Sequence, residues 1–166
     1  MKEILHHKTL DYVINYPDDY EEGKKFPLLI HLHGAGTRGN DISLVADTAV
    51  GPLGEINRGV RLPFIIAAPQ CPGKTWFEYS ETLLSLIDTL VAREDVDRSR
   101  VYLCGISMGG YACWQVATVR AELFAAVMPV CGGGMPWAAG YMKGLPVWAH
   151  HGALDGSVDV SNSIDM

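Results

Sequence analysis

Short runs of apolar residues, each followed within a few residues by glycine or proline, recur along this chain. Because these runs lack polar alternation, they are typical of strands buried on both faces, as in a parallel sheet covered by helices. Residues 80–93 place leucines at helical spacing after Ser80, a candidate N-cap, and residues 111–119 predict a second helix. Strands that alternate with helices indicate β-α-β units and an α/β fold. The predicted buried strands are 26–33, 62–68, 101–104, 124–130 and 145–149, and 9–16 is predicted to be half-buried.

The balance of apolar and charged residues bounds the class of protein. Apolar residues make up 48% of the chain and charged residues 19%, which favours one soluble globular domain over residues 1–166. The formal net charge is −6 and the 13 Lys and Arg residues form no basic run. We expect no nucleic-acid partner, because phosphate neutralisation needs clustered cations. No stretch approaches the roughly 18 apolar residues that span a bilayer, and the N-terminus lacks the apolar region of a secretory signal, so no membrane partner is expected.

Four cysteines, Cys71, Cys104, Cys113 and Cys131, lie in apolar or strand-like segments without C-x-x-C spacing. That pattern favours reduced, buried thiols over a zinc or redox site. Reduced thiols predict a cytoplasmic location. No metal or organic cofactor is expected.

The segment Gly105-Ile106-Ser107-Met108-Gly109 has the pattern G-x-S-x-G. A predicted strand enters it and a predicted helix leaves it, which is the arrangement of a nucleophile elbow. So tight a turn requires residues almost without side chains two positions before and after the serine. Ser107 is therefore the candidate nucleophile, and the N–H of Met108 is a candidate oxyanion donor.

Two further loops follow predicted strands, at the edge of the sheet where ligands bind in α/β folds. The loop His33-Gly34-Ala35-Gly36 can direct a backbone N–H at a substrate carbonyl oxygen bound to Ser107. The loop that starts at His150 carries Asp155, 48 residues after Ser107, which suits the acid of a triad in the order Ser, acid, His. Asp159 is the competitor in the same loop.

These motifs together resemble the carboxylesterase, phospholipase and dienelactone-hydrolase-like branch of the α/β-hydrolases. The matching stretches are H-G-A-G-T-R-G-N-D (33–41), A-P-Q-C-P (68–72), G-I-S-M-G-G (105–110) and H-G-A-L-D (151–155). The resemblance implies Ser107 as nucleophile, Asp155 as acid, and Ala35 with Met108 as oxyanion donors. Serine at the nucleophile, where dienelactone hydrolases carry cysteine, points to the esterase side.

The chain departs from that pattern at its end. Related enzymes carry the triad histidine after one more strand, whereas here 11 residues follow Asp155 and none is His. We interpret the chain as a C-terminally truncated form whose α/β-hydrolase fold, a mostly parallel sheet flanked by helices, lacks the last strand and helix. Of the six histidines, His33 and His151 are expected to brace their loops rather than reach Ser107.

Three other side chains bear on the substrate. Trp76 and Phe77 follow the A-P-Q-C-P loop and are candidates for the wall of an acyl or alcohol pocket, with ordinary packing as the alternative. Arg38 could bind a substrate anion, but pairing with Asp41 is the favoured interpretation.

The predicted function is that of a serine carboxylic-ester hydrolase, impaired in this form, with a small-molecule ester as substrate. A peptidase or amide hydrolase of the same fold is the alternative within the same chemistry. A non-catalytic binding module is the alternative from another class, because no triad histidine is present. Self-association through an open sheet edge at 145–149 is also expected.

Overall fold

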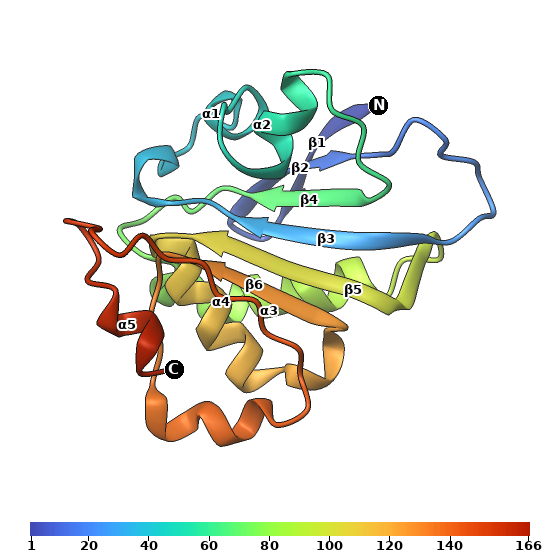
Figure 1. Ribbon diagram of the computed structural model, residues 1–166. Coiled ribbons are helices and arrows are strands. Elements are labelled where there is room, and N and C mark those ends of the chain that lie inside the picture. Colours follow the sequence, from blue (N-terminus) through green and yellow to red (C-terminus); the bar gives the residue numbers. More distant parts are fainter.

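A single mixed sheet of six strands organises the computed structural model, which describes residues 1–166 (Figure 1). The strand order is β1-β2-β4-β3-β5-β6. The first two strands join antiparallel, whereas β4, β3, β5 and β6 are parallel to one another. The predicted fold class is confirmed. The strands are β1 (Lys2–His7), β2 (Leu10–Asn15), β3 (Phe26–Leu32), β4 (Ile65–Pro69), β5 (Val96–Ile106) and β6 (Ala126–Val130).

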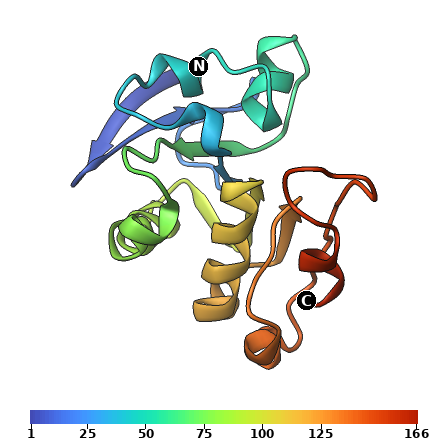
Figure 2. The same ribbon diagram turned by 90° about the vertical axis from the view of Figure 1, so that its left-hand side faces the viewer.

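Helices cover both faces of this sheet (Figures 1 and 2). The short helices α1 (Ser43–Ala46) and α2 (Gly51–Asn57) lie on one face, and α3 (Ser80–Val91) and α4 (Met108–Val119) lie on the other. A last short helix, α5 (Ser161–Ile164), ends the chain beyond the carboxyl edge of the sheet. The 3-10 turns are η1 (Ala35–Thr37), η2 (Trp76–Tyr79), η3 (Ala121–Leu123) and η4 (Pro136–Met142).

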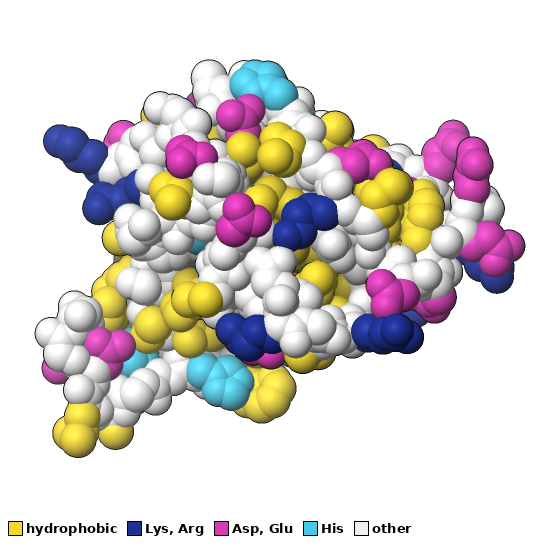
Figure 3. Space-filling model, turned by 90° about the horizontal axis from the view of Figure 1, so that it is seen from above, with side chains coloured by type: hydrophobic (Ala, Val, Ile, Leu, Met, Phe, Trp, Pro, Cys, Tyr) yellow, Lys and Arg dark blue, Asp and Glu magenta, His cyan; other side chains and the backbone are white.

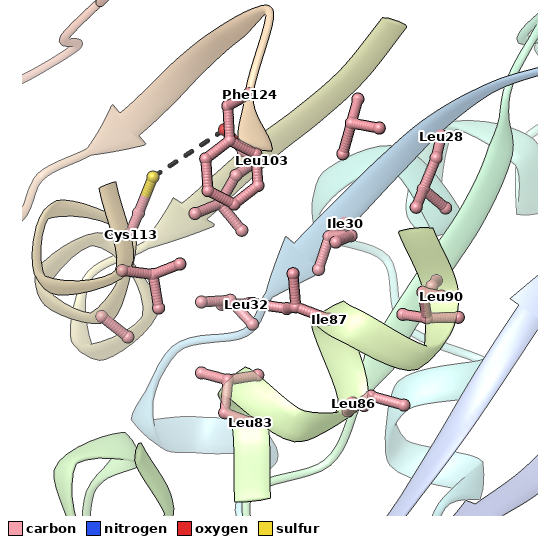
Figure 4. Packing of buried hydrophobic residues seen from close by; sticks show 14 of the residues in the cluster. Leu28, Ile30, Leu32, Leu83, Leu86, Ile87, Leu90, Leu103, Cys113 and Phe124 are labelled. Atoms are coloured by element: carbon pink, nitrogen blue, oxygen red, sulfur yellow. Dashed lines mark hydrogen bonds between the residues drawn. The ribbon is translucent and has the colours of Figure 1, made fainter. Parts of the chain in front are cut away.

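Successive side chains of a strand point to opposite faces of the sheet, so the strands contribute to two separate hydrophobic cores, one on each face. The larger core, 27 buried residues, packs strand residues such as Ile30 and Leu103 against α3 and α4. Figure 4 shows Ile87 and Leu83 of α3 in contact with Leu32 of β3. The smaller core lies under α1 and α2. Because both faces are covered, the central strands are apolar throughout.

Among the predicted boundaries that differ from the structure, two have a clear local cause. The strand predicted at 101–104 belongs to the longer β5. The first half of β5 is not predicted because Asp97 and its neighbours are polar and do not look like a buried strand. Ser80 is the first residue of α3 rather than its N-cap, and its hydroxyl donates to the carbonyl of Phe77 at 2.9 Å. The preceding turn η2 runs directly into the helix, so no separate capping residue is present there.

On the face seen from above, basic side chains are interspersed with acidic ones (Figure 3).

No helix in the chain is both long and apolar enough to cross a membrane.

The sequence predicts a buried strand at 145–149, and that prediction is wrong. The segment runs parallel to β6 and exchanges backbone hydrogen bonds with it, but residues 146–150 are exposed. The pairing is limited to two bridges, Val127 with Val147 and Val130 with His150. Between them Pro129 has no N–H to donate, so the ladder is interrupted. No element of the chain lies on the other side of the segment to bury it.

We predict that this edge makes the chain self-associate. The N–H groups of Val147 and Ala149 have no backbone partner, and Trp148 beside them is 68% exposed. At the opposite edge, Lys2 and Glu3 of β1 place charges that discourage pairing. Light scattering at micromolar concentration should show a dimer or larger species, and Val147→Lys should shift it toward monomer. A stable wild-type monomer that binds no dye for exposed apolar surface would contradict this prediction.

Candidate active site

Ser107 occupies a strained turn between β5 and α4. Its backbone angles are φ 54° and ψ −118°, in a region that costs a non-glycine residue about 1–3 kcal/mol. Two hydrogen bonds hold the turn: the Ser107 N–H donates to the Val130 carbonyl at 2.8 Å, and the Ser107 carbonyl accepts from the Tyr111 N–H at 3.0 Å. The serine therefore stands at the carboxyl edge of the sheet, as a nucleophile elbow requires.

The glycines on either side of Ser107 are required by close backbone contacts. A Cβ on Gly105 would lie 2.1 Å from the Gly109 carbonyl oxygen, and a Cβ on Gly109 would lie 1.9 Å from the Leu32 carbonyl oxygen. A side chain at Gly105 would force α4 away from the end of β5, and one at Gly109 would force α4 away from β3. This is the physical reason for the G-x-S-x-G pattern.

The glycine-rich loop after β3 lies directly against the elbow. A Cβ on Gly34 would be 3.5 Å from Ser107 Cβ. Ala35 is the first residue of η1 and Met108 is the first residue of α4, and the N–H of a first helical residue has no partner within its own helix. Ala35 and Met108 thus each have a backbone N–H free of helical partners, and their role as oxyanion donors stays a prediction.

A cavity of about 330 Å³ opens beside Ser107, between this loop and the helices α1 and α2. Most of its apolar wall comes from segments that the sequence did not single out. The wall residues are Val45, Val50, Leu53 and Ile106. A volume of this size falls in the range of small-molecule pockets.

Trp76 does not line this cavity, so its predicted role as a pocket wall is corrected. The indole is 1% exposed, its Nε1–H donates to the His33 carbonyl at 3.1 Å, and its ring packs on the His33 ring. Phe77 is half exposed and lines a separate hollow with Tyr111 and Trp114. Neighbours in the sequence therefore have different roles, because η2 directs Trp76 inward and Phe77 outward.

Arg38 does not pair with Asp41, and that prediction is also wrong. Its Nε donates to the Ala35 carbonyl at 2.8 Å, and its Nη1 donates to the Lys74 carbonyl at 3.0 Å. Asp41 instead accepts from the hydroxyl and N–H of Ser43. Arg38 therefore ties the loop after β3 to the loop after β4.

Asp155 lies in the loop that leaves the segment paired with β6. Its Oδ1 accepts from the N–H groups of Val158 and Ser157, which hold the pKa of the carboxyl below its ordinary value. Its Oδ2 has no hydrogen bond and lies 3.8 Å from His151 Nε2. No hydrogen bond joins Asp155 to Ser107. Asp159 is exposed and accepts from the Ser161 N–H at the start of α5.

None of the six histidines forms a hydrogen bond with Ser107. His33 bonds to Gly34 in its own loop and to Cys71 in the loop after β4. His151 bonds to Val158 in its own loop and to Ser163 in α5, so both histidines brace their loops as expected. His150 is exposed against Trp148, and His6 and His7 lie on β1 at the far edge of the sheet. No histidine is therefore hydrogen-bonded to Ser107 in this structure.

His31 is buried between β3 and β5, where its Nδ1 lies 3.2 Å from Cys104 Sγ. Burial lowers the pKa of His31 to about 4, against about 6.5 in an unfolded chain. Between pH 6.5 and pH 4 the His31 ring is protonated in the unfolded state but not in the folded state. The free energy of unfolding therefore decreases as pH falls from 6.5 toward 4. We expect His31 to account for about 2 kcal/mol of lost unfolding free energy between pH 7 and pH 4.5.

Urea unfolding of the wild type and of His31→Gln at both pH values measures this term. The variant should lose less stability on acidification by that amount, because glutamine does not titrate. Equal losses in the two proteins would show that His31 is protonated as easily in the folded state as in the unfolded state.

A strained serine between a parallel strand and a helix, next to a glycine-rich loop at the carboxyl edge of the sheet, defines the α/β-hydrolase fold with a serine elbow. Comparisons with known proteins agree. A model of the prolyl oligopeptidase family matches residues 79–148. The solved structure of a thermostable esterase superposes with a TM-score of 0.79 and 30% identity, over 99% of this chain and 49% of that one.

Curated relatives are similar along almost all of the chain. A probable feruloyl esterase C of Aspergillus oryzae is 29% identical over 94% of this chain and 62% of its own length. Feruloyl esterase C of Emericella nidulans is 27% identical over 92% and 60% respectively. The resemblance to α/β-hydrolase serine esterases is confirmed. The chain spans about three fifths of the length of these relatives.

Proposed function

We propose that the protein hydrolyses carboxylic esters through an acyl-serine intermediate on Ser107. The observation that carries this proposal is the strained elbow, which places Ser107 in the lining of a cavity together with Ala35. We place the N–H groups of Ala35 and Met108 there as hydrogen-bond donors to the substrate. Donors placed at that point stabilise the negative charge that develops on the carbonyl oxygen, an effect worth about 3–4 kcal/mol for each donor. We include Ala35 and Met108 in the proposal as the oxyanion hole.

The proposed reaction has two steps. Ser107 Oγ attacks the acyl carbon, a histidine takes the hydroxyl proton, and the alcohol leaves after receiving that proton. Water then cleaves the acyl-serine bond by the same route. Asp155 would orient the histidine through Oδ2, since Oδ1 is already occupied by two backbone donors.

We further propose esters of aromatic acids as the substrate class. The curated relatives are named feruloyl esterases, and the apolar cavity of about 330 Å³ beside Ser107 has room for a substituted phenyl ring. The cytoplasmic location stays a prediction. Three of the four cysteines are buried free thiols and Cys131 is partly buried.

A fluorophosphonate probe and a substrate panel test the proposal. The probe should label Ser107 and should not label Ser107→Ala. Methyl ferulate should be cleaved with a higher kcat/KM than methyl hexanoate, and both in preference to a p-nitroanilide. Preferred cleavage of the anilide would favour the amide hydrolase, a function that the match to the prolyl oligopeptidase family makes worth testing. No labelling of Ser107 in a form of the protein that supplies a histidine to it would favour the non-catalytic binding module.

A further inference from the structure

Side chains bind the carbonyl groups of the loop after β3 one after another. The His33 carbonyl accepts from Trp76 Nε1, the Gly34 carbonyl lies 2.7 Å from His33 Nδ1, and the Ala35 carbonyl accepts from Arg38 Nε. Gln70 Nε2 donates to the Thr37 carbonyl in the same way. A loop with its carbonyls fixed also has its N–H groups fixed, because the two belong to shared peptide planes.

His33 has its tautomer set by its second partner. Nε2 of the ring accepts the Cys71 N–H at 2.9 Å and must therefore carry no proton. Nδ1 then carries the proton and donates it to the Gly34 carbonyl. Burial lowers the pKa of His33, so the ring stays neutral in this arrangement. The ring is 5% exposed and packed on Trp76, which leaves it little freedom to turn.

The Gly34 carbonyl and the Ala35 N–H belong to one peptide unit. The bond is trans, as are all peptide bonds in the chain, so the two groups point in opposite directions. Because the carbonyl is bound to the His33 ring, the Ala35 N–H is directed away from that ring. Ala35 and Ser107 both line the cavity beside the elbow.

We propose that His33 is a positioning residue that directs the Ala35 N–H at the oxyanion. This inference rests on the proposed function. His33 is among the residues that line the cavity, but both of its ring nitrogens are bonded, to Gly34 and to Cys71. It therefore acts through the Gly34–Ala35 peptide plane, whose carbonyl also accepts from the Thr37 N–H at 3.3 Å. The hydrogen bond from Nδ1–H to the Gly34 carbonyl orients the peptide plane, and the hydrogen bond from the Cys71 N–H to Nε2 sets the tautomer of the ring.

Two substitutions separate these bonds. The asparagine in His33→Asn places an amide N–H where Nδ1 lies and keeps the donor to Gly34. The glutamine in His33→Gln reaches the position of Nε2 and keeps an acceptor for Cys71, but loses that donor. His6→Gln, which replaces an exposed histidine on β1, is the matched control. A purely structural role would give both His33 variants the same kinetic effect.

Hydrolysis of p-nitrophenyl acetate is the first readout, because turnover without a histidine base depends on the oxyanion hole and binding. We expect His33→Gln to lose about 10²–10³ of the Ser107-dependent kcat, as for removal of one donor, with little change in KM. His33→Asn should lose at least tenfold less. Equal losses in the two variants would overturn the inference.

Nitrogen-15 NMR of the 166-residue chain is the second readout and needs no activity. The His33 ring should show a protonated Nδ1 and a bare Nε2, and the Ala35 amide resonance should move in His33→Gln but little in His33→Asn. A protonated Nε2, or an unmoved Ala35 amide, would overturn the inference. In a form of the protein that supplies a histidine to Ser107, turnover that Ser107→Ala leaves unchanged would instead refute the proposed function, and the NMR result would still decide the role of His33.

Discussion

Ser107→Ala is expected to lower kcat on activated esters by about 10⁶ in any form of the protein that supplies a histidine to Ser107. Removal of the serine from a complete triad removes the nucleophile itself, and losses of this size accompany it. The variant should fold, since the Ser107 side chain makes no hydrogen bond and the turn is held by backbone groups and by the glycines around it. Steady-state kinetics with p-nitrophenyl acetate measures the loss.

In the 166-residue chain the same substitution should have a much smaller effect. With no histidine bonded to Ser107, turnover should remain only about 10³–10⁴ above the rate in water, because the hydroxyl is a poor nucleophile at its own pKa. Free imidazole added to the buffer should raise the rate of the wild type above that of Ser107→Ala in the same buffer. A kcat near the ordinary enzyme value of about 10 s⁻¹ without imidazole would show that a histidine of the chain serves as base.

The motifs around Ser107 could be predicted from the sequence because their requirements are local. Gly105 and Gly109 must be glycine wherever a strand turns into a helix this tightly, and the apolar runs of β3 and β4 must be buried on both faces. Requirements of this kind can be recognised within a single stretch of sequence, without knowledge of the rest of the fold.

Features that depend on partners far along the chain could not be predicted in the same way. The segment 145–149 has the composition of a buried strand, but its burial depends on a neighbouring element that this chain does not place there. The position of Trp76 after a loop predicts a pocket wall, yet its partner, the His33 carbonyl, lies 43 residues earlier. The cavity wall from Val45, Val50 and Leu53 has no motif at all, because packing of α1 and α2 on the sheet creates it.

Asp155→Asn is expected to cost about 10⁴ in kcat wherever a histidine completes the triad. An amide in place of the carboxylate stabilises the wrong imidazole tautomer, and a loss of that size follows in a serine protease with the corresponding change. The introduced asparagine would still accept the Val158 and Ser157 N–H groups through its carbonyl oxygen, as Oδ1 of Asp155 does now. The loop should therefore keep its shape, so the loss should appear in kcat and not in thermal stability.

Asp159→Asn is the matched control in the same loop. Asp159 accepts the Ser161 N–H where α5 begins, and asparagine serves there about as well as aspartate. The substitution should leave kcat almost unchanged, since the side-chain carbonyl oxygen of asparagine can accept the same Ser161 N–H. If Asp159→Asn is the damaging change and Asp155→Asn is mild, the two carboxylates have the opposite roles, and the acid of the triad lies at the start of α5.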